Sequence, residues 1–269
     1  MKNTLELLKL YYFACKFKKI KRTNEVVENE YTNAWNNWHQ HLDKAATLED
    51  FKRINETGKK GLYIKNDKLM YGFCDDSFYI KTIFSILKKE FSSAKKILEF
   101  GSGPGRNLLF LKKKNPKLNL MGFELTKSGV ELTKKASKKF KLKIGVRRQN
   151  ILEMKTRLKG DVGFSCFALE QINIPLDDAK KLIIKLLGCV KSGLILLEPL
   201  EEYYPKSLRG YFARKFHQKI GYCNTFARAC EELALEGNII IRIIQLTSCH
   251  NPLLFPTILI IKKSKRTIK

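Results

Sequence analysis

The sequence predicts an α/β protein: a seven-stranded, mostly parallel, doubly wound sheet with an antiparallel last strand, preceded by an N-terminal helical extension. Three observations support this class. Short apolar runs typical of strands alternate with helix-periodic segments across residues 78–263. One of these runs turns through closely spaced glycines directly into a helix at residues 97–111. Two late apolar runs, 239–246 and 257–261, follow one another without a helical segment between them.

Size and composition narrow the class further. A chain of 269 residues has room for one large domain and an appendage, and it holds no apolar run of transmembrane length. Its seven cysteines are scattered without a C-x-x-C motif, which indicates free thiols in a reducing compartment. We therefore expect a cytoplasmic protein. We expect no metal site, because the histidines are not spaced as metal ligands usually are.

The first part of the chain has the pattern of helices. Residues 3–22 fit a basic amphipathic helix, which leaves three interpretations open: docking onto the domain, peripheral contact with a membrane surface, and organelle targeting. Residues 25–30 have the composition of a polar connector. Residues 31–46 fit a second helix, with Trp35 and Trp38 on one side.

A short helix and a hairpin follow. Thr47 and Asp50 are placed to cap the short helix, and residues 62–71 fit two strands around a turn. We assign residues 1–76 to an N-terminal helical extension that can act as a lid, and residues 77–269 to the main domain.

Capping signals mark helices of the main domain. Asp75 and Asp76 are expected to begin the helix that leads into the first strand. Ser128 and Glu131 fit a capping box for the second crossover helix, and Asn224 fits the cap of the last one.

The strongest functional signal follows the strand at residues 97–100. Glycine falls at positions Gly101, Gly103 and Gly105, and Glu99 precedes the first of them by two positions. A strand that turns through glycines into a helix brings backbone N–H groups and the positive end of the helix dipole close to a ligand. The spacing E-x-G-x-G-x-G differs from the G-x-G-x-x-G fingerprint of dinucleotide-binding folds. A carboxylate at this place suits a cationic ligand and would repel a pyrophosphate.

Four further strand ends carry polar side chains. Glu124 ends the second strand, where an acid in a doubly wound fold accepts hydrogen bonds from ribose hydroxyls. Asn150 follows the third strand, and its amide carbonyl can accept a hydrogen bond without adding charge. Glu170 comes just after the fourth strand, and Glu198 ends the fifth.

Glu99, the glycines after it and Glu124 resemble motif I and the next strand end of class I S-adenosylmethionine-dependent methyltransferases. The late strand pair resembles the sixth and seventh strands of that family. The resemblance implies a methyltransferase that binds S-adenosylmethionine. It also implies the residues that bind this cofactor: Glu99, Gly101, Ser102, Gly103, Gly105, Asn107, Glu124, Leu125, Asn150, Ile151 and Phe167. At the exit of the third strand the family usually has an acid that contacts adenine, and this chain has Asn150.

The methyl acceptor is expected beyond the carboxyl ends of the strands. Residues 199–223 form an aromatic and basic insertion after the fifth strand, placed to cover the acceptor site. Candidate acceptor-binding residues are Trp35, Tyr203, Tyr211 and His217. An alcohol or ammonium acceptor must also lose a proton, and Glu170 and Glu198 are the carboxylates best placed to take it.

The charge of the chain leaves several partners open. It carries 52 Lys and Arg against 26 Asp and Glu, and residues 134–148 hold eight of these basic residues and no acidic one. Such a surplus attracts nucleic acid, anionic membranes or an anionic substrate, although a generally lysine-rich composition explains it equally well.

We expect a small-molecule acceptor, and an anionic one is among the options. An RNA methyltransferase is an alternative, but no N/D-P-P-F/Y motif follows the fourth strand, as it would for base amino groups. A cofactor-binding partner protein without catalysis is the other alternative.

Overall fold

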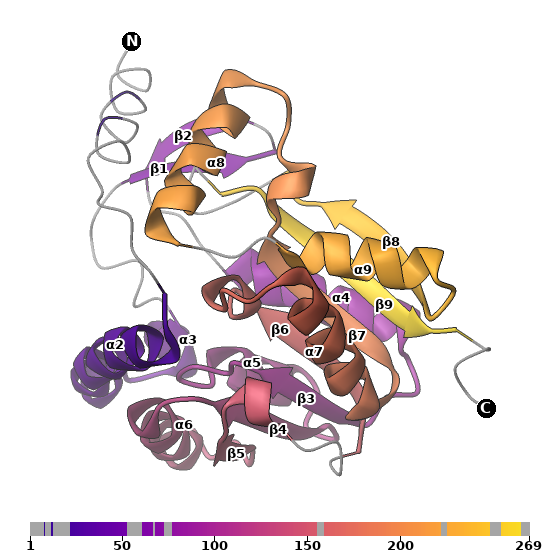
Figure 1. Ribbon diagram of the computed structural model, residues 1–269. Helices are drawn as coiled ribbons and strands as arrows, with labels where there is room; N and C mark the ends of the chain where they lie inside the picture. The colour runs from indigo at the N-terminus through magenta and orange to yellow at the C-terminus, as the bar shows by residue number, and fades with distance from the viewer. Residues whose placement is uncertain are drawn as a thin grey trace.

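The computed structural model consists of one large sheet with helices on both faces (Figure 1). It describes residues 8, 12, 22–52, 61–66, 68–72, 77–154, 159–221, 225–247 and 254–264. Within these ranges the large sheet has seven strands, in the order β5 (Gly145–Arg148), β4 (Asn119–Glu124), β3 (Lys96–Phe100), β6 (Gly160–Cys166), β7 (Val190–Pro199), β9 (Pro256–Lys263) and β8 (Ile239–Gln245). Neighbouring strands pair in parallel except at β9, which is antiparallel to both β7 and β8. The predicted fold class is confirmed.

The strand order reverses between β3 and β6. From β3 the chain goes outward through β4 to β5, and it then returns to the other side of β3 as β6 and β7. Ligands in open α/β sheets bind at such a reversal, beyond the carboxyl ends of the strands. The segment 101–105, called the glycine loop below, lies at this point because it follows β3 directly.

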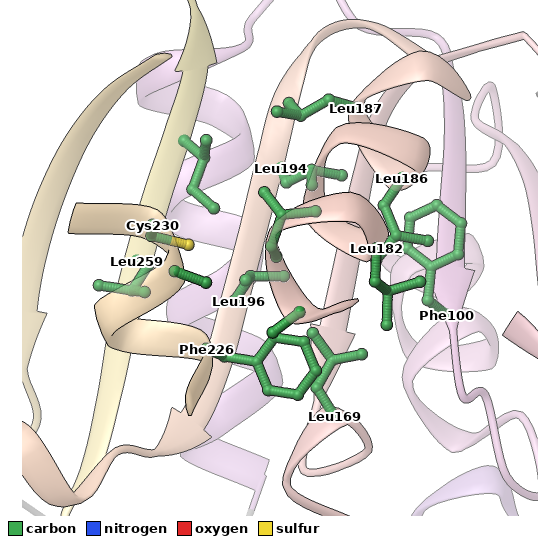
Figure 2. Packing of buried hydrophobic residues seen from close by; sticks show 14 of the residues in the cluster. Phe100, Leu169, Leu182, Leu186, Leu187, Leu194, Leu196, Phe226, Cys230 and Leu259 are labelled. Atoms are coloured by element: carbon green, nitrogen blue, oxygen red, sulfur yellow. The ribbon is translucent and has the colours of Figure 1, made fainter. Parts of the chain in front are cut away.

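Alternate residues of the strands supply two separate hydrophobic layers. The helices that cover the sheet are α4 (Ser77–Glu90), α5 (Arg106–Lys114), α7 (Leu176–Gly188) and α9 (Thr225–Leu235). Leu98 and Leu196 are buried in the cluster beneath α7 and α9. Figure 2 shows Leu196 and Phe226 in this cluster. Ile97 and Ile195 point to the opposite face, beneath α4 and α5. This period of two follows from the pleat of the strands, and each buried Leu or Ile contributes about 1.5–3 kcal/mol.

The helices of the N-terminal extension pack on the side of the domain that carries β4 and β5 (Figure 1). It contains α2 (Asn24–Lys44), α3 (Leu48–Lys52) and a hairpin of β1 (Gly61–Lys65) and β2 (Lys68–Gly72). Helix α2 lies against α6 (Lys127–Lys139), and Leu42 and Phe51 are buried there with Leu132 and Ala136. The division of the chain between residues 76 and 77 stays a prediction.

Side-chain capping explains where the N-terminal helices begin. The cap of α3 is confirmed, because Thr47 N–H donates to Asp50 Oδ2 at 2.8 Å and Asp50 N–H donates to Thr47 Oγ1 at 3.1 Å. The predicted connector at 25–30 is wrong, since these residues belong to α2. Thr23 Oγ1 accepts from Val26 N–H at 3.3 Å, which allows the helix to begin a full turn and more before the predicted start.

The predicted capping box at Ser128 is also wrong. Thr126 caps α6, because its Oγ1 accepts from Gly129 N–H at 3.0 Å. Ser128 is buried and donates instead to Asn36 Oδ1 of α2 at 2.7 Å. Ser128 therefore links α6 to α2 and does not cap its own helix.

Some of the predicted helix signals fall outside the residues that the structure describes. The predicted helix signals outside them are most of 3–21, Asp75, Asp76 and Asn224. Leu8 and Tyr12 are helical and exposed. Among the helices that the structure describes, none has the length and apolar character to cross a membrane. Cys166, Cys189 and Cys230 are thiols and not members of a disulfide.

Candidate cofactor and acceptor site

A cavity of about 440 Å³ opens beyond the carboxyl ends of β3, β4 and β6. Its volume lies in the ordinary range for small-molecule sites. Its wall includes nine of the eleven residues predicted to bind the cofactor: Gly101, Ser102, Gly103, Asn107, Glu124, Leu125, Asn150, Ile151 and Phe167. Glu99 and Gly105 are not on the wall.

The glycine loop leaves no room for side chains. The φ angles of Gly101, Gly103 and Gly105 are 76°, 50° and 75°, which L-residues rarely adopt. A Cβ on Gly103 would lie 3.1 Å from the ring of Trp35, and one on Gly101 would lie 2.3 Å from Cβ of Ala168. The backbone of the glycine loop therefore contacts the side chain of Trp35 in α2 on one side. On the other side it contacts the side chain of Ala168 in the loop after β6.

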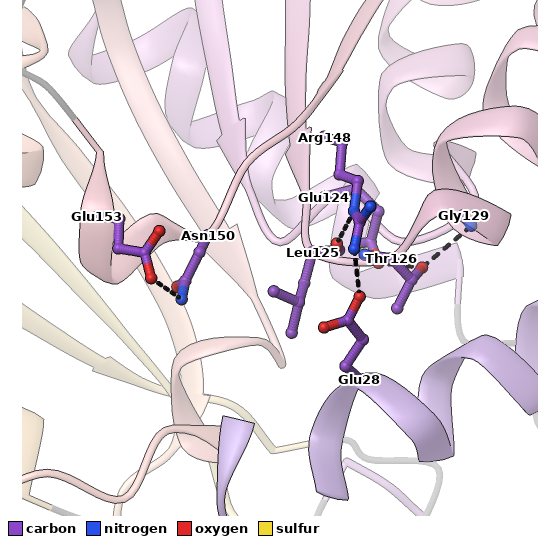
Figure 3. Close-up of polar contacts among 8 residues, drawn as sticks. All are labelled: Glu28, Glu124, Leu125, Thr126, Gly129, Arg148, Asn150 and Glu153. Atoms are coloured by element: carbon purple, nitrogen blue, oxygen red, sulfur yellow. Dashed lines mark hydrogen bonds and ion pairs between the residues drawn. The ribbon is translucent and has the colours of Figure 1, made fainter. Parts of the chain in front are cut away.

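Glu124 joins the end of β4 to this loop. Its Oε2 accepts from Gly103 N–H at 2.9 Å, and its Oε1 accepts from the N–H and the hydroxyl of Thr126 at 3.0 and 2.7 Å. Figure 3 shows Glu124 beside Thr126 and the start of α6. A carboxylate oxygen can accept two hydrogen bonds, so Oε2 keeps acceptor capacity toward the cavity.

Glu99 lies behind the loop and is fully buried. Its Oε1 accepts from Asn107 Nδ2 at 2.8 Å, and its Oε2 has no partner among the described residues. Burial raises the pKa of Glu99 to about 8, and the nearby Glu124 adds to this, while Asn107 and Arg106 oppose it. Glu99 therefore orients Asn107, which is on the wall, and does not itself reach the cavity.

Asn150 has a local structural task. Its Oδ1 accepts from Leu152 N–H at 3.0 Å and its Nδ2 donates to Glu153 Oε1 at 3.2 Å, so it caps the 3₁₀ turn Ile151–Glu153 (Figure 3). The amide that was predicted to meet adenine thus already serves the backbone. One lone pair of Oδ1 remains for a ligand.

Helix α2 closes one side of the cavity. Val27, Tyr31 and Trp35 are on the wall, and their spacing of four residues puts them on one face of the helix. Val27 was missed because it falls in the segment taken for a connector. The repeat of apolar and aromatic residues at positions 27, 31 and 35 is the signal that could have found it.

Two cation contacts hold α2 on the domain. Arg148 pairs with Glu28 of α2 at 2.6 Å and also donates through Nε to the carbonyl of Leu125 at 3.1 Å (Figure 3). The guanidinium of Arg106 lies 4.7 Å from the ring centre of Trp38. Both cations come from elements next to the predicted cofactor residues.

Glu198, predicted as a possible base, is not on the cavity wall. It is 1% exposed, and its Oε1 accepts from the hydroxyl of Ser165 at 2.7 Å and from the N–H groups of Leu169 and Ala168 at 3.2 and 3.3 Å. Its Oε2 accepts from Glu170 N–H at 3.3 Å. Burial raises the pKa of Glu198 to about 7, although these donors favour the ionised form. Glu198 therefore holds the turn Leu169–Gln171 and lies off the cavity wall, and its role as a base stays a prediction.

Glu170 does line the cavity. It is 5% exposed, its Oε1 accepts from Gln171 Nε2 at 2.8 Å, and its Oε2 meets no partner in the described part of the chain. Burial raises the pKa of Glu170 well above its usual value, and the negative charge of Glu198 adds to this. Gln171 and Arg22 oppose the shift.

Phe167, just after β6, lies on the cavity wall in a strained backbone conformation. Its φ is 56°, which is uncommon for any residue other than glycine and costs about 1–3 kcal/mol. Its ring lies 4.8 Å from that of Tyr79, which is also on the wall. Such strain is concentrated at functional sites, so it independently marks the loop after β6.

Three predicted acceptor residues do not line the cavity: Tyr203, Tyr211 and His217. Tyr203 donates its hydroxyl to Glu231 at 2.6 Å, and Tyr211 is half exposed. His217 is fully buried beside the hydroxyl of Tyr204, and burial lowers its pKa to about 3. The insertion instead contributes Phe216 of α8 (Leu208–Ile220), because a shift of one residue along a helix turns the side chain by about 100°.

The wall also carries residues that the sequence did not single out for the site. They include Tyr31, Tyr79, Arg106, Gln149, Gln171, Phe216 and Leu254. The structure finds no group of three or more His, Cys, Asp or Glu suited to a metal ion within its described ranges.

Comparisons with known proteins identify the fold. No family model and no curated protein matches the sequence. Among solved structures, the chain resembles magnesium protoporphyrin IX methyltransferase from Synechocystis PCC 6803 with bound S-adenosylhomocysteine. That match has a TM-score of 0.61 and 12% identity, and covers 90% of this chain and 100% of that one.

Two further structures give the same result. The plantazolicin methyltransferase BpumL with S-adenosylhomocysteine matches with a TM-score of 0.54 and 12% identity, over 91% of this chain and 100% of that one. The methyltransferase domain of bacterial CtHen1 matches with a TM-score of 0.51 and 17% identity, over 70% and 98%. The chain has the fold of class I S-adenosylmethionine-dependent methyltransferases.

Proposed function

We propose that this protein is an S-adenosylmethionine-dependent methyltransferase that acts on a small molecule. One observation carries the proposal: Glu124 accepts a hydrogen bond from Gly103 N–H, and both residues line the cavity beside the glycine loop. This arrangement places a carboxylate and a side-chain-free backbone together, as binding of a sugar and a cationic group requires. The shared fold supports the same conclusion.

The residues present fit this cofactor. Gly101 and Gly103 put backbone without side chains on the cavity wall, and Glu124 and Asn150 keep acceptor lone pairs for ribose and adenine. Glu99 is buried behind the loop and orients Asn107 on the cavity wall. When bound, S-adenosylmethionine supplies a methyl group attached to a positively charged sulfur, which makes the methyl electrophilic.

The protein's own contribution is alignment and exclusion of water. Trp35, Phe167 and Phe216 give the cavity apolar walls, and α2 covers it from one side. Positioning of this kind can supply a large part of a rate enhancement in a displacement reaction. Glu170 is the carboxylate on the wall that can accept a proton from an acceptor.

Calorimetric titration with S-adenosylmethionine and S-adenosylhomocysteine tests the proposal, followed by a methyl-transfer assay over a broad panel of small acceptors. Saturable binding of both compounds and a methylated product are expected. Absence of binding would reject the enzyme. Binding without any product would favour the partner protein that uses the fold only to present a surface.

An RNA acceptor remains the second candidate, because basic residues of α6 and β5 such as Lys134, Lys138 and Arg147 are exposed. Binding to these would depend strongly on salt. A gel-shift with RNA that disappears between low and moderate salt, together with methyl transfer to that RNA, would favour this candidate over a metabolite.

A further inference from the structure

We propose that the end of the cavity formed by the turn after β6 binds the nitrogen of an amine acceptor, with Glu170 and Gln171 accepting its N–H groups. This rests on the proposed function, because the amine would receive the methyl group. It narrows the small-molecule class to primary and secondary amines.

Two buried oxygen atoms carry the inference. Glu170 and Gln171 are each 5% exposed, and both are on the cavity wall. Gln171 Nε2 donates to Glu170 Oε1 at 2.8 Å, which leaves Glu170 Oε2 and Gln171 Oε1 buried with no partner anywhere in the described residues. Buried polar atoms in folded proteins are nearly always hydrogen-bonded, so a ligand that donates to both atoms is the simplest explanation.

Counting donors selects the chemical group. An ammonium has three N–H groups and an amine has one or two, so a protonated primary or secondary amine can satisfy both oxygens at once. Against ionised Glu170, a hydroxyl has a single donor and leaves one of the two oxygens unsatisfied. A carboxylate or phosphate has no donor when ionised and would place negative charge against Glu170.

The acidic and basic side chains on the cavity wall also favour an amine. The acidic residues on the described wall are Glu124 and Glu170, and Arg106 is the basic one. Carboxyl groups therefore outnumber basic side chains on this wall, although the whole chain carries a net charge of +26. The local lining decides what the cavity binds, since it is nearest to the ligand.

The turn is rigidly placed next to the glycine loop. Glu198 accepts from the N–H groups of Ala168, Leu169 and Glu170, and Ala168 itself packs against Gly101. Glu198 is thus a positioning residue, which fixes the backbone from which Glu170 and Gln171 project. The amine site adjoins the cofactor site through this contact.

Binding of an amine is expected to release a proton. The charged groups near Glu170 are Glu198 from β7 and Arg22 from the segment before α2, and burial together with Glu198 keeps the pKa of Glu170 raised in the free protein. An ammonium that binds next to Glu170 favours the ionised carboxylate, so a proton leaves either Glu170 or the ammonium itself. An alcohol of the same shape causes no such release.

The test uses the full chain saturated with S-adenosylhomocysteine, so that binding of this compound separately checks the proposed function. Benzylamine, benzyl alcohol and benzoate are titrated by calorimetry in two buffers of different ionisation heat, and butylamine, butanol and butyrate form a second series. The amine of at least one series should bind about tenfold or more tightly than its alcohol and acid, with proton release. The substitution Glu170→Gln should remove this preference and the proton release, while the affinity for S-adenosylhomocysteine stays within about threefold.

Glu236→Gln, past the end of α9, is the matched control and should leave every value unchanged. Equal affinities within both series, a preference for the acids, or no binding by either amine would overturn the inference, even if Glu170→Gln does not fold. A folded Glu170→Gln protein that no longer binds S-adenosylhomocysteine would also overturn it, because Glu170 would then serve the cofactor.

Discussion

Two pairs of buried glutamates lie on either side of the strand reversal, and they divide their tasks in the same way. In each pair one carboxylate bonds to backbone N–H groups and holds a loop: Glu124 holds the glycine loop, and Glu198 holds the turn after β6. The other member keeps an oxygen without a partner among the described residues, Glu99 behind the wall and Glu170 on it. The comparison teaches that, in each pair, one carboxylate anchors a loop through backbone N–H groups, while the other keeps a buried oxygen without a partner in the described part of the chain.

The largest effect is expected from blocking the loop that the first pair supports. Gly103→Val introduces a side chain at φ 50° and against Trp35. Binding of S-adenosylhomocysteine should be lost, a change of more than about 3 kcal/mol in binding free energy. Circular dichroism should still show a folded sheet, and an unchanged affinity in calorimetry would remove the loop from the site.

Titration of Glu99 should give the next largest effect. Its pKa is raised to about 8, so between pH 4.5 and 8 the folded protein keeps a proton that the unfolded chain has lost. The free energy of unfolding should therefore fall as pH rises through this window, by at most about 5 kcal/mol from this group. Chemical denaturation at several pH values measures the slope, and Glu99→Gln should reduce it; an unaltered slope would contradict the assignment.

Removal of Glu198 sharpens the contrast within the second pair. Glu198→Ala leaves three N–H groups of the turn and the hydroxyl of Ser165 without their acceptor, which should lower the free energy of unfolding by about 3 kcal/mol. Glu170→Gln removes no such set of bonds and should change it by less than about 1 kcal/mol. Urea denaturation of both variants decides this, and equal losses would break the proposed division of tasks.

Glu124→Ala should weaken binding of the methyl donor by about 1–3 kcal/mol, because ribose hydroxyls and Gly103 N–H lose their acceptor. Calorimetry measures the difference, with Glu131→Gln, an exposed acid of α6, as the control. An undiminished affinity would restrict Glu124 to a structural role.

The smallest effect concerns the attachment of α2. Arg148→Ala removes the ion pair with Glu28, which is partly exposed, so the free energy of unfolding should fall by no more than about 1 kcal/mol. A loss well above that in thermal denaturation would show that the helix depends on this contact far more than an exposed pair allows.

The sheet and the glycine loop could be predicted from sequence because their signals are local. The apolar runs fix the strands, and glycines at φ angles between 50° and 76° are a requirement of the backbone itself. Glu124 followed from its place at a strand end. The same reasoning could not separate Glu170 from Glu198, since which carboxylate meets the cavity depends on a turn that folds back over β7.

Other details depend on equally specific contacts. Asn150 lies on the cavity wall, and its Oδ1 also caps the turn that follows, which the sequence alone did not show. The insertion was expected to cover the acceptor site, and the phase of α8 places Phe216 and not His217 on the cavity wall. Helix phase and capping are settled by packing, which a single sequence does not contain.

The most direct measurement is a calorimetric titration of S-adenosylmethionine into the wild-type chain, Gly103→Val and Glu124→Ala under one set of conditions. The account predicts saturable binding to the wild type, weaker binding to Glu124→Ala and none to Gly103→Val. Binding of equal strength to all three, or to none of them, would contradict the claim that the glycine loop and Glu124 together hold the methyl donor.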